Sequence, residues 1–145
     1  AEIFSLQQIK EALQGVDVTT AIEEGFVAYS RGEVVVPPVG ELVFSPPGDV
    51  HIKYGYIKDD DYFVIKVASG FYGAVDTGLP PYDGLMLVFS QKTARLECIL
   101  LDECYLTNVR TAAAGAVVAK YLAPSRVERI GVLGAGVQGK MQVEA

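Results

Sequence analysis

The segment Arg129–Gly139, RIGVLGAGVQG, joins a short apolar run to a glycine-rich turn. Ile130–Leu133 predicts a β-strand, and Gly134, Gly136 and Gly139 follow it with the spacing GxGxxG at a predicted helix start. In this context the first glycine allows a tight turn, the second lets a pyrophosphate approach the backbone, and the third allows close helix packing. The segment therefore predicts a dinucleotide-binding turn, with a simple glycine turn as the alternative.

This segment also divides the chain, because only six residues follow Gly139. The acidic residue that completes a dinucleotide site lies about 20 positions further on and is expected outside this sequence. We therefore predict one complete domain over residues 1–125. Residues 126–145 are predicted to be the truncated strand, turn and helix that open a Rossmann α/β domain.

Composition excludes several classes of protein. Half of the 145 residues are hydrophobic and the net charge is -6, which favours a globular domain and disfavours a nucleic-acid partner. Cys98 and Cys104 have neither zinc-site nor disulfide-framework spacing, so we predict free thiols and no metal. No apolar run reaches the length of a membrane span. The expected location is the cytoplasm.

Two short helices are predicted near the N-terminus. Ser5 begins a capping-box pattern and predicts a helix over residues 6–13. Thr20 begins a second such pattern, and the apolar stripe that follows ends before Gly32, the residue type expected just beyond a helix end. Both helices precede the part of the chain that is rich in β-branched residues.

A mostly antiparallel sheet is predicted next. Short apolar runs broken by Pro and Gly are typical of strands, and Asp59–Asp61 predicts the turn of one hairpin. Residues 69–84 are predicted to be a loop, and a second hairpin follows over residues 85–101. Asp102 is predicted to be the N-cap of a long helix over residues 103–122. The expected fold class is α+β.

Lys66 stands out because its strand, YFVIKVAS, is apolar on both faces. Its ammonium group is therefore expected at a sheet edge or in a cleft. A lysine in low dielectric needs an anionic partner, and a substrate carboxylate is one candidate. The alternative is a lysine whose stem lies along the apolar surface while its charge reaches water.

Arg110 stands out because helical spacing places it on the inward stripe with Ala113 and Val117. A buried guanidinium needs a partner, and its planar fork suits a carboxylate or phosphate. An internal ion pair with Asp83 or Glu97 is the alternative. We favour ligand binding.

The strand VHIKYGYI is predicted to have two unlike faces. His51 and Lys53 alternate onto one face, and Tyr54 and Tyr56 onto the other. His51 is the only histidine and is interpreted as structural or solvent-facing rather than catalytic. Lys53 is a candidate second cation for an anionic substrate, although an exposed lysine is the simpler reading. The tyrosines are expected in a core or subunit interface.

The sequences VRTAAAGAVVAKYLA, at residues 109–123, and RIGVLGAGVQG together resemble the ornithine cyclodeaminase and mu-crystallin family. The resemblance implies a substrate-binding and dimerisation domain followed by a Rossmann domain that holds NAD or NADP. It implies that Lys66 and Arg110 bind the carboxylate of a small amino-acid or imino-acid substrate. It further implies that residues of the turn contact the cofactor and that a threonine of the preceding helix lies close to it. These residues are Thr111, Gly134, Gly136, Gln138 and Gly139.

Two departures from the family pattern bear on activity. Ornithine cyclodeaminases carry another carboxylate-binding arginine near the first strands, but no Arg occurs here between Arg31 and Arg95, and we hypothesise that Lys53 replaces it. The family's catalytic aspartate lies beyond Ala145. The resemblance implies a cyclodeaminase, an amino-acid dehydrogenase or a ketimine reductase. The alternatives are a non-catalytic, NADPH-binding mu-crystallin-like protein and a stand-alone dimerisation module.

Overall fold

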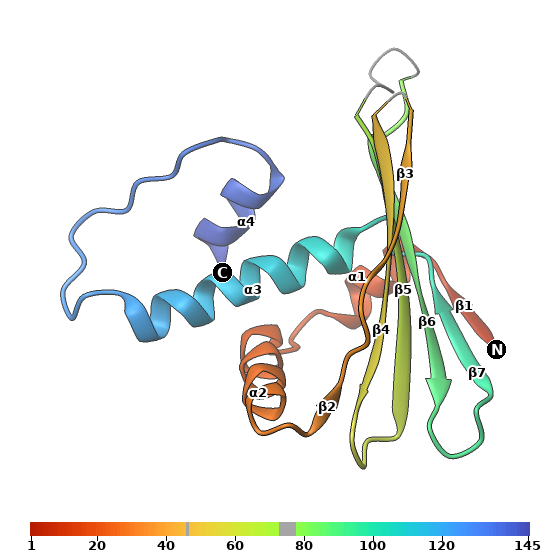
Figure 1. The fold of residues 1–145 in the computed structure, drawn as a ribbon. Coiled ribbons are helices and arrows are strands. Elements are labelled where there is room, and N and C mark those ends of the chain that lie inside the picture. Colours follow the sequence, from red (N-terminus) through yellow and green to blue (C-terminus); the bar gives the residue numbers. More distant parts are fainter. Residues whose placement is uncertain (46, 73–77) are drawn as a thin grey trace. The chain divides into compact units, whose positions relative to one another are not determined.

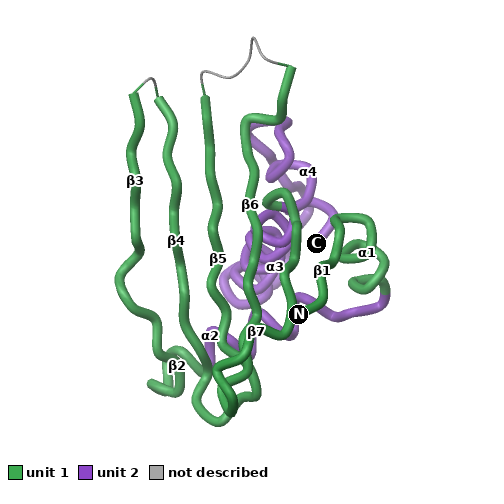
Figure 2. The backbone as a smooth tube through the Cα atoms, turned by 90° about the vertical axis from the view of Figure 1, so that its right-hand side faces the viewer, with its two compact units in different colours: residues 1–14, 28–104 green, residues 15–27, 105–145 purple. Residues whose placement is uncertain are grey.

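The computed structural model describes residues 1–45, 47–72 and 78–145. The chain, drawn in Figure 1, divides into two compact units that Figure 2 distinguishes by colour. Unit 1 consists of residues 1–14 and 28–104, and unit 2 of residues 15–27 and 105–145. The division into domains 1–125 and 126–145 stays a prediction.

Unit 1 is built on a seven-stranded sheet with the order β1-β7-β6-β5-β4-β2, in which β3 also pairs with β4. Every neighbouring pair is antiparallel except β1 and β7, which are parallel. The predicted α+β class with a mostly antiparallel sheet is therefore confirmed. The strands are β1 (Glu2–Phe4), β2 (Val34–Val35), β3 (Gly40–Phe44), β4 (Gly48–Ile57), β5 (Tyr62–Phe71), β6 (Tyr82–Ser90) and β7 (Leu96–Leu100).

Both predicted hairpins form. β4 and β5 join through a turn in which Asp59 has a φ of 66°, a left-handed conformation that aspartate tolerates better than most residues. The predicted loop over residues 69–84 is too long, because β5 continues to Phe71 and β6 begins at Tyr82. Residues 73–77 of that loop lie outside the described residues. Sequence reasoning also missed β1, whose three residues are too few to show alternation.

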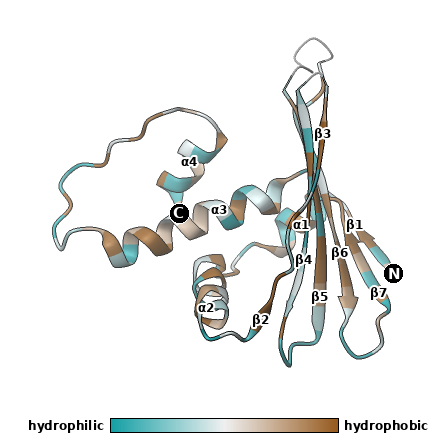
Figure 3. Cartoon of the chain, viewed as in Figure 1, coloured by the Kyte–Doolittle hydropathy of each residue, from teal (hydrophilic) through white to brown (hydrophobic). Residues whose placement is uncertain are grey.

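The two faces of the sheet carry different residues, because side chains alternate along each strand. One face, here called the lysine face, carries Lys53 and Lys66. The other, here called the apolar face, carries aromatic and aliphatic side chains, and Phe63 stacks on Phe89 with ring centroids 4.9 Å apart. Figure 3 shows the long hydrophobic stretches of β5 and β6.

α1 (Leu6–Ala12) completes unit 1 and is the predicted first helix to within one residue. Its capping box is present: the Gln8 backbone N–H donates to the Ser5 hydroxyl, and the Ser5 backbone N–H donates to the Gln8 side chain at 2.9 Å. Ile9 is the buried residue of this helix. Local sequence therefore determined the start of α1.

Unit 2 contains α3 (Tyr105–Leu122), α4 (Val137–Glu144) and most of α2 (Val18–Ser30). α2 begins earlier than predicted, because Asp17 rather than Thr20 caps it: the Asp17 carboxylate accepts the Thr20 backbone N–H at 3.0 Å. Gly32 follows the helix with a φ of 72°, as predicted.

A polar cluster ties α2 to α3 within unit 2. The Glu23 carboxylate accepts hydrogen bonds from the Lys120 ammonium, at 2.7 Å, and from the Tyr121 hydroxyl. These bonds hold the pKa of the Glu23 carboxyl below its ordinary value, with the Lys120 bond as the larger cause. These bonds therefore join two helices whose contacting residues, Glu23 and Lys120, are 97 positions apart in the sequence.

Two boundary predictions in the C-terminal part are wrong. Asp102 is not the N-cap of α3, because the helix begins at Tyr105 and the two residues between have φ values of 49° and 64°. The predicted strand Ile130–Leu133 is absent as well. A strand needs a hydrogen-bonded neighbour, and no described segment pairs with these residues.

Candidate functional site

Two lysines lie opposite each other on the lysine face. Lys53 of β4 is the Cα partner of Lys66 of β5, so their Cβ atoms are about 5 Å apart. Of the two positions predicted for Lys66, a sheet edge and a cleft, the sheet edge is excluded because β5 is an interior strand. Lys66 is half-buried between Lys53 and Met86, whereas Lys53 is exposed. The sheet thus places two positive charges side by side, a relationship that sequence spacing could not reveal.

His51 lies on the same face, two residues before Lys53. Its Nε2 is 3.2 Å from the Glu41 carboxylate and its Nδ1 is 3.7 Å from the Asp49 carboxylate. Glu41 is the direct cross-strand partner of His51, as the β3–β4 register shows. The ring therefore has one hydrogen-bond partner, Glu41, and a second carboxylate nearby.

Gly84 and Cys104 meet on the lysine face as well. A Cβ at Gly84 would lie 2.9 Å from the Cys104 Sγ, and that thiol donates to the Asp83 carbonyl at 3.0 Å. Burial raises the pKa of the Cys104 thiol. Cys98 and Cys104 are both free cysteines.

Arg110 and Thr111 lie in α3 of unit 2. Arg110 is exposed, which corrects its predicted place on the inward stripe; Ala112, Ala113 and Val117 are the buried residues. Among the described residues of unit 2 no carboxylate forms an ion pair with Arg110. The Thr111 hydroxyl donates to the Thr107 carbonyl at 2.7 Å. The guanidinium is therefore available to an anion.

The three glycines of the turn differ in backbone conformation and in what surrounds them. Gly134 has a φ of 99°, and a Cβ at Gly139 would lie 2.4 Å from the Gly134 carbonyl oxygen. Gly136 is the N-cap of α4 without a side-chain cap, and a Cβ there would meet nothing within 4 Å. The three glycines thus supply the turn, the open approach and the close helix contact.

A hollow of about 460 Å³ borders this turn and is lined by Val132, Gly134, Ala135, Gly139, Lys140, Val143 and Glu144. Gln138 has a different role in this structure. Its side-chain amide donates to the Asn108 carbonyl at 3.2 Å and to the Asn108 side chain at 2.9 Å. Gln138 therefore links α4 to α3, and its predicted contact with a cofactor stays a prediction.

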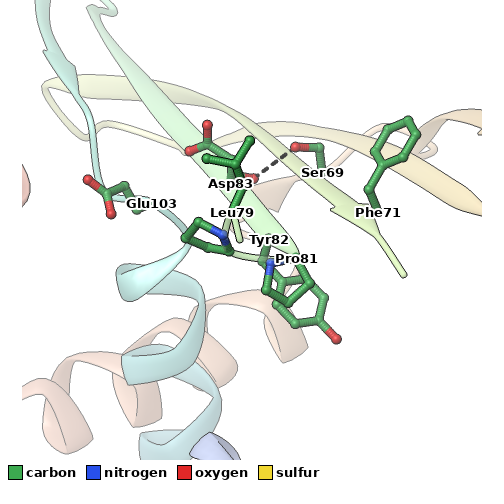
Figure 4. A pocket seen from close by; sticks show the side chains of 8 residues that line it. Ser69, Phe71, Leu79, Pro81, Tyr82, Asp83 and Glu103 are labelled. Carbon is green, nitrogen blue, oxygen red and sulfur yellow. Dashed lines mark hydrogen bonds between the residues drawn. The ribbon is translucent and has the colours of Figure 1, made fainter. Parts of the chain in front are cut away.

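A second hollow, of about 500 Å³, lies at the ends of β5 and β6. Sequence reasoning missed it because the predicted loop over residues 69–84 hid the strand ends that form it. The carboxylates of Asp83 and Glu103 lie toward one end and Phe71 toward the other, and Ser69 donates to the Asp83 carbonyl (Figure 4). The lining residues are Ser69, Phe71, Leu79, Pro80, Pro81, Tyr82, Asp83 and Glu103.

The model of the ornithine cyclodeaminase/mu-crystallin family matches residues 2–145. The chain belongs to this family. An uncharacterized cyclodeaminase of Sinorhizobium fredii is 39% identical over 131 residues, which cover 89% of this chain and 40% of that protein. The chain therefore spans about 40% of the length of this curated relative.

Solved structures of the family share the fold. An archaeal alanine dehydrogenase dimer with bound NAD aligns with a TM-score of 0.91 at 32% identity, covering 99% of this chain and 44% of that one. The Thermococcus litoralis Δ1-pyrroline-2-carboxylate reductase, in complex with NADH and L-proline, aligns with a TM-score of 0.87 at 25% identity, covering 99% and 45%.

None of the helices in residues 1–45, 47–72 and 78–145 is long and apolar enough to cross a membrane. Within the same ranges, no three His, Cys, Asp or Glu side chains are grouped so that they could hold a metal ion.

Proposed function

We propose that this chain is the substrate-binding part of an NAD(P)-dependent enzyme that acts on the nitrogen-bearing carbon of a small amino or imino acid. The observation that carries the proposal is the Lys53–Lys66 pair on one sheet face, in a chain whose relatives include an alanine dehydrogenase and a pyrroline-2-carboxylate reductase. The glycine turn of unit 2 adds the cofactor side of the proposal.

The lysine pair would bind the substrate carboxylate. Two lysines on directly opposite residues of one sheet face present positive charge to the same region, and this suits a carboxylate. Lys66 would make the stronger bond, because it is half-buried and less screened by water than Lys53. Arg110 has no carboxylate partner within its unit, and its planar guanidinium suits a two-point contact with a carboxylate. The family resemblance implies that it also binds the substrate.

The glycine turn would hold the cofactor. The start of α4 is open at Gly136, where a Cβ would meet nothing within 4 Å, and the positive end of the helix dipole favours a phosphate there. When bound, the nicotinamide accepts or supplies a hydride at the substrate carbon. The chain's own residues would orient the carboxylate so that this carbon faces the cofactor.

We further propose that the protein is a homodimer joined through the apolar face. Leu42, Phe44, Tyr54, Tyr56 and Phe71 lie on this face and are each more than a third exposed in a single chain. A contiguous apolar patch of this kind marks an interaction surface. A second copy is the occupant we favour, because the related archaeal alanine dehydrogenase is a dimer.

The activity is tested on the complete protein by absorbance at 340 nm. We expect a change with a small amino acid and NAD(P), or with a cyclic imine and NAD(P)H. A cyclodeaminase returns its hydride, so ammonia release from ornithine or a similar diamino acid tests that branch. Absence of all three signals would contradict the enzymatic proposal and favour a non-catalytic NADPH-binding protein.

Cofactor binding is tested separately by titration of NADH fluorescence. In Gly136→Ala the new methyl group touches no protein atom but fills the space where a phosphate would approach, so affinity is expected to fall at least tenfold. Gly131→Ala is the matched control, because its methyl group also meets nothing within 4 Å. Equal affinity in both variants would contradict the proposed phosphate contact.

The stand-alone dimerisation module is a different reading of the same apolar face. It predicts that residues 1–145 form a folded dimer that does not bind a cofactor. Size-exclusion chromatography with light scattering tests this reading. A monomer would exclude the module.

A further inference from the structure

The side chain of Gln138, the glutamine of the glycine turn, contacts α3. Gln138 is the second residue of α4, and its amide donates to the Asn108 carbonyl at 3.2 Å and to the Asn108 side-chain oxygen at 2.9 Å. Both residues are half-buried. Asn108 lies in the first turn of α3, and both helices belong to unit 2. The side-chain amide of Gln138 is therefore engaged by a neighbouring helix of the same unit.

One helical turn further along, α4 packs over a glycine of α3. A Cβ at Gly115 would lie 2.6 Å from Gln142 Oε1, and the Gln142 amide donates to the Gln138 side chain at 3.4 Å. Gly115 lies about two turns after Asn108 and so on the same side of α3. The side of α4 that carries both glutamines therefore rests on one side of α3.

The start of α4 is also in close contact with the turn that precedes it. Gly139 directly follows Gln138, and a Cβ at Gly139 would lie 2.4 Å from the Gly134 carbonyl oxygen. Because no side chain separates these two glycines, a displacement of the first turn of α4 must also displace the glycine turn. The contact between Gln138 and α3 therefore restrains the turn as well as the helix.

A different part of α4 borders the hollow beside the turn. That hollow, of about 460 Å³, is lined by Gly139, Lys140 and Val143 of this helix, and not by Gln138 or Gln142. The backbone N–H groups in the first turn of a helix have no acceptor within the helix. The backbone of Gln138 can therefore serve a phosphate while its side chain is held by α3.

We propose that Asn108 is a positioning residue for the cofactor: it holds the Gln138 side chain against α3 and so fixes the glycine turn in the orientation that receives a dinucleotide phosphate. This role rests on the proposed phosphate contact of the turn. The link between Asn108 and Gln138 does not, because it consists of hydrogen bonds inside unit 2.

Two substitutions in the complete protein remove the link from either side. Asn108→Leu keeps the approximate size of the side chain and removes its acceptor, and Gln138→Leu removes the donor. Leucine has a higher helix propensity than asparagine and about the same propensity as glutamine, so neither helix is weakened. Gln142→Leu is the matched control, because it lies one turn further along α4 and loses a longer bond, of 3.4 Å, that does not reach α3.

Titration of NADH fluorescence measures the effect on cofactor binding. Asn108→Leu is expected to bind NADH about fivefold more weakly, and Gln138→Leu about tenfold more weakly because it loses both bonds. The double variant should bind no more weakly than Gln138→Leu, since both residues act through one link. Gln142→Leu should stay within about twofold of wild type.

Steady-state kinetics separates positioning from a general loss of stability. In Asn108→Leu the KM for NAD(H) should rise about fivefold, while kcat and the KM for the amino or imino acid stay nearly unchanged. A general loss of stability would instead lower the amount of active enzyme and so the apparent kcat. A fall in kcat with an unchanged KM for NAD(H) would therefore overturn the positioning role.

Hydrogen exchange followed by mass spectrometry, on protein without cofactor, measures the link itself. In Asn108→Leu we expect the backbone amides of residues 134–139 to exchange at least threefold faster than in wild type. Gln142→Leu should leave their exchange unchanged. Equal exchange in Asn108→Leu and wild type would overturn the link.

The binding data distinguish positioning from direct contact. Weaker NADH binding in Gln138→Leu alone would show that this side chain contacts the cofactor itself, and would overturn the role of Asn108. Losses that add in the double variant would show independent roles and would overturn it too. So would unchanged binding in both single variants of a protein whose affinity does fall in Gly136→Ala.

The same Gly136→Ala variant separates this proposal from the proposed function. If Gly136→Ala leaves NADH affinity unchanged, the proposed phosphate contact fails and the positioning role of Asn108 fails with it. The exchange data still decide whether the link between Asn108 and Gln138 restrains the turn.

Discussion

The two faces of the sheet are made from the same strands and yet suit different tasks. Along β5, Lys66 lies on one face and its neighbour Ile65 on the other. The lysine face carries the two lysines and a histidine close to two carboxylates. Gly84 lies against the Cys104 thiol on the same face. The apolar face has aromatic stacking and exposed hydrophobic side chains instead.

This difference shows how one layer of backbone can separate ligand chemistry from association. Strand alternation places residues only one position apart on opposite sides of the sheet. A substitution on one face should therefore affect one task and spare the other. The predictions below use this separation and proceed from the largest expected effect to the smallest.

Lys66→Met should have the largest effect and should act on the lysine face alone. Loss of a half-buried charge opposite a carboxylate is expected to cost about 3 kcal/mol, or roughly 100-fold in kcat/KM. Steady-state kinetics measures it, with Lys92→Met as control, because Lys92 is an exposed lysine paired with Asp61 at a hairpin turn. An altered oligomeric state in Lys66→Met would contradict the assignment of substrate binding and dimerisation to separate faces.

Tyr54→Asp should act on the apolar face alone. Tyr54 is 43% exposed in the single chain, so the fold should tolerate the change. A charge in the dimer interface is expected to cost about 2 kcal/mol, or roughly 30-fold in the dimer dissociation constant. Tyr62→Asp is the matched control on the lysine face, where Tyr62 is 50% exposed. Sedimentation that finds both variants equally dimeric would contradict the proposed interface.

Phe63→Leu, on the apolar face, should destabilise the protein without changing substrate binding. Phe63 stacks on Phe89 with an interplanar angle of 5°. Loss of this pair is expected to lower the free energy of unfolding by about 1 kcal/mol. A double-mutant cycle with Phe89→Leu in urea isolates the pair. Coupling near zero would show that the two rings merely fill space.

Lys53→Ala should have the smallest effect. Lys53 is exposed, so water screens its charge, and its loss is expected to cost about 0.7 kcal/mol, or roughly threefold in KM. Kinetics of the complete enzyme measures it. Unchanged substrate affinity would refute the hypothesis that Lys53 replaces the arginine of ornithine cyclodeaminases.

Much of the fold could be predicted from local signals. The capping box at Ser5, the glycine at position 32 and the turn at Asp59 each depend on neighbours a few residues away, and each was found. β1 was not, because its three residues acquire a strand conformation only by pairing with β7, more than 90 positions along the chain. Long-range pairing leaves no trace in a three-residue segment.

Some features of the candidate site could likewise be predicted from the sequence, and others could not. Lys66 and the glycine turn could be singled out from residue type alone, because a lysine in an apolar strand and a GxGxxG turn are unusual. The pairing of Lys66 with Lys53 could not, since it depends on the β4–β5 register. Helical periodicity predicts Arg110 on the inward side of α3, but the apolar residues of this helix are spread over much of its surface, so periodicity does not identify the buried side.

The two segments of unit 2 also set an order of assembly. Residues 15–27 and 105–145 are separated in sequence by the whole β2–β7 region, and the Glu23–Lys120 contact spans 97 positions. Hairpins such as β4–β5 close early because their strands are adjacent, whereas distant contacts form late. During synthesis α2 therefore leaves the ribosome well before α3, and the Glu23–Lys120 contact cannot form until all the strands of the sheet have been synthesised.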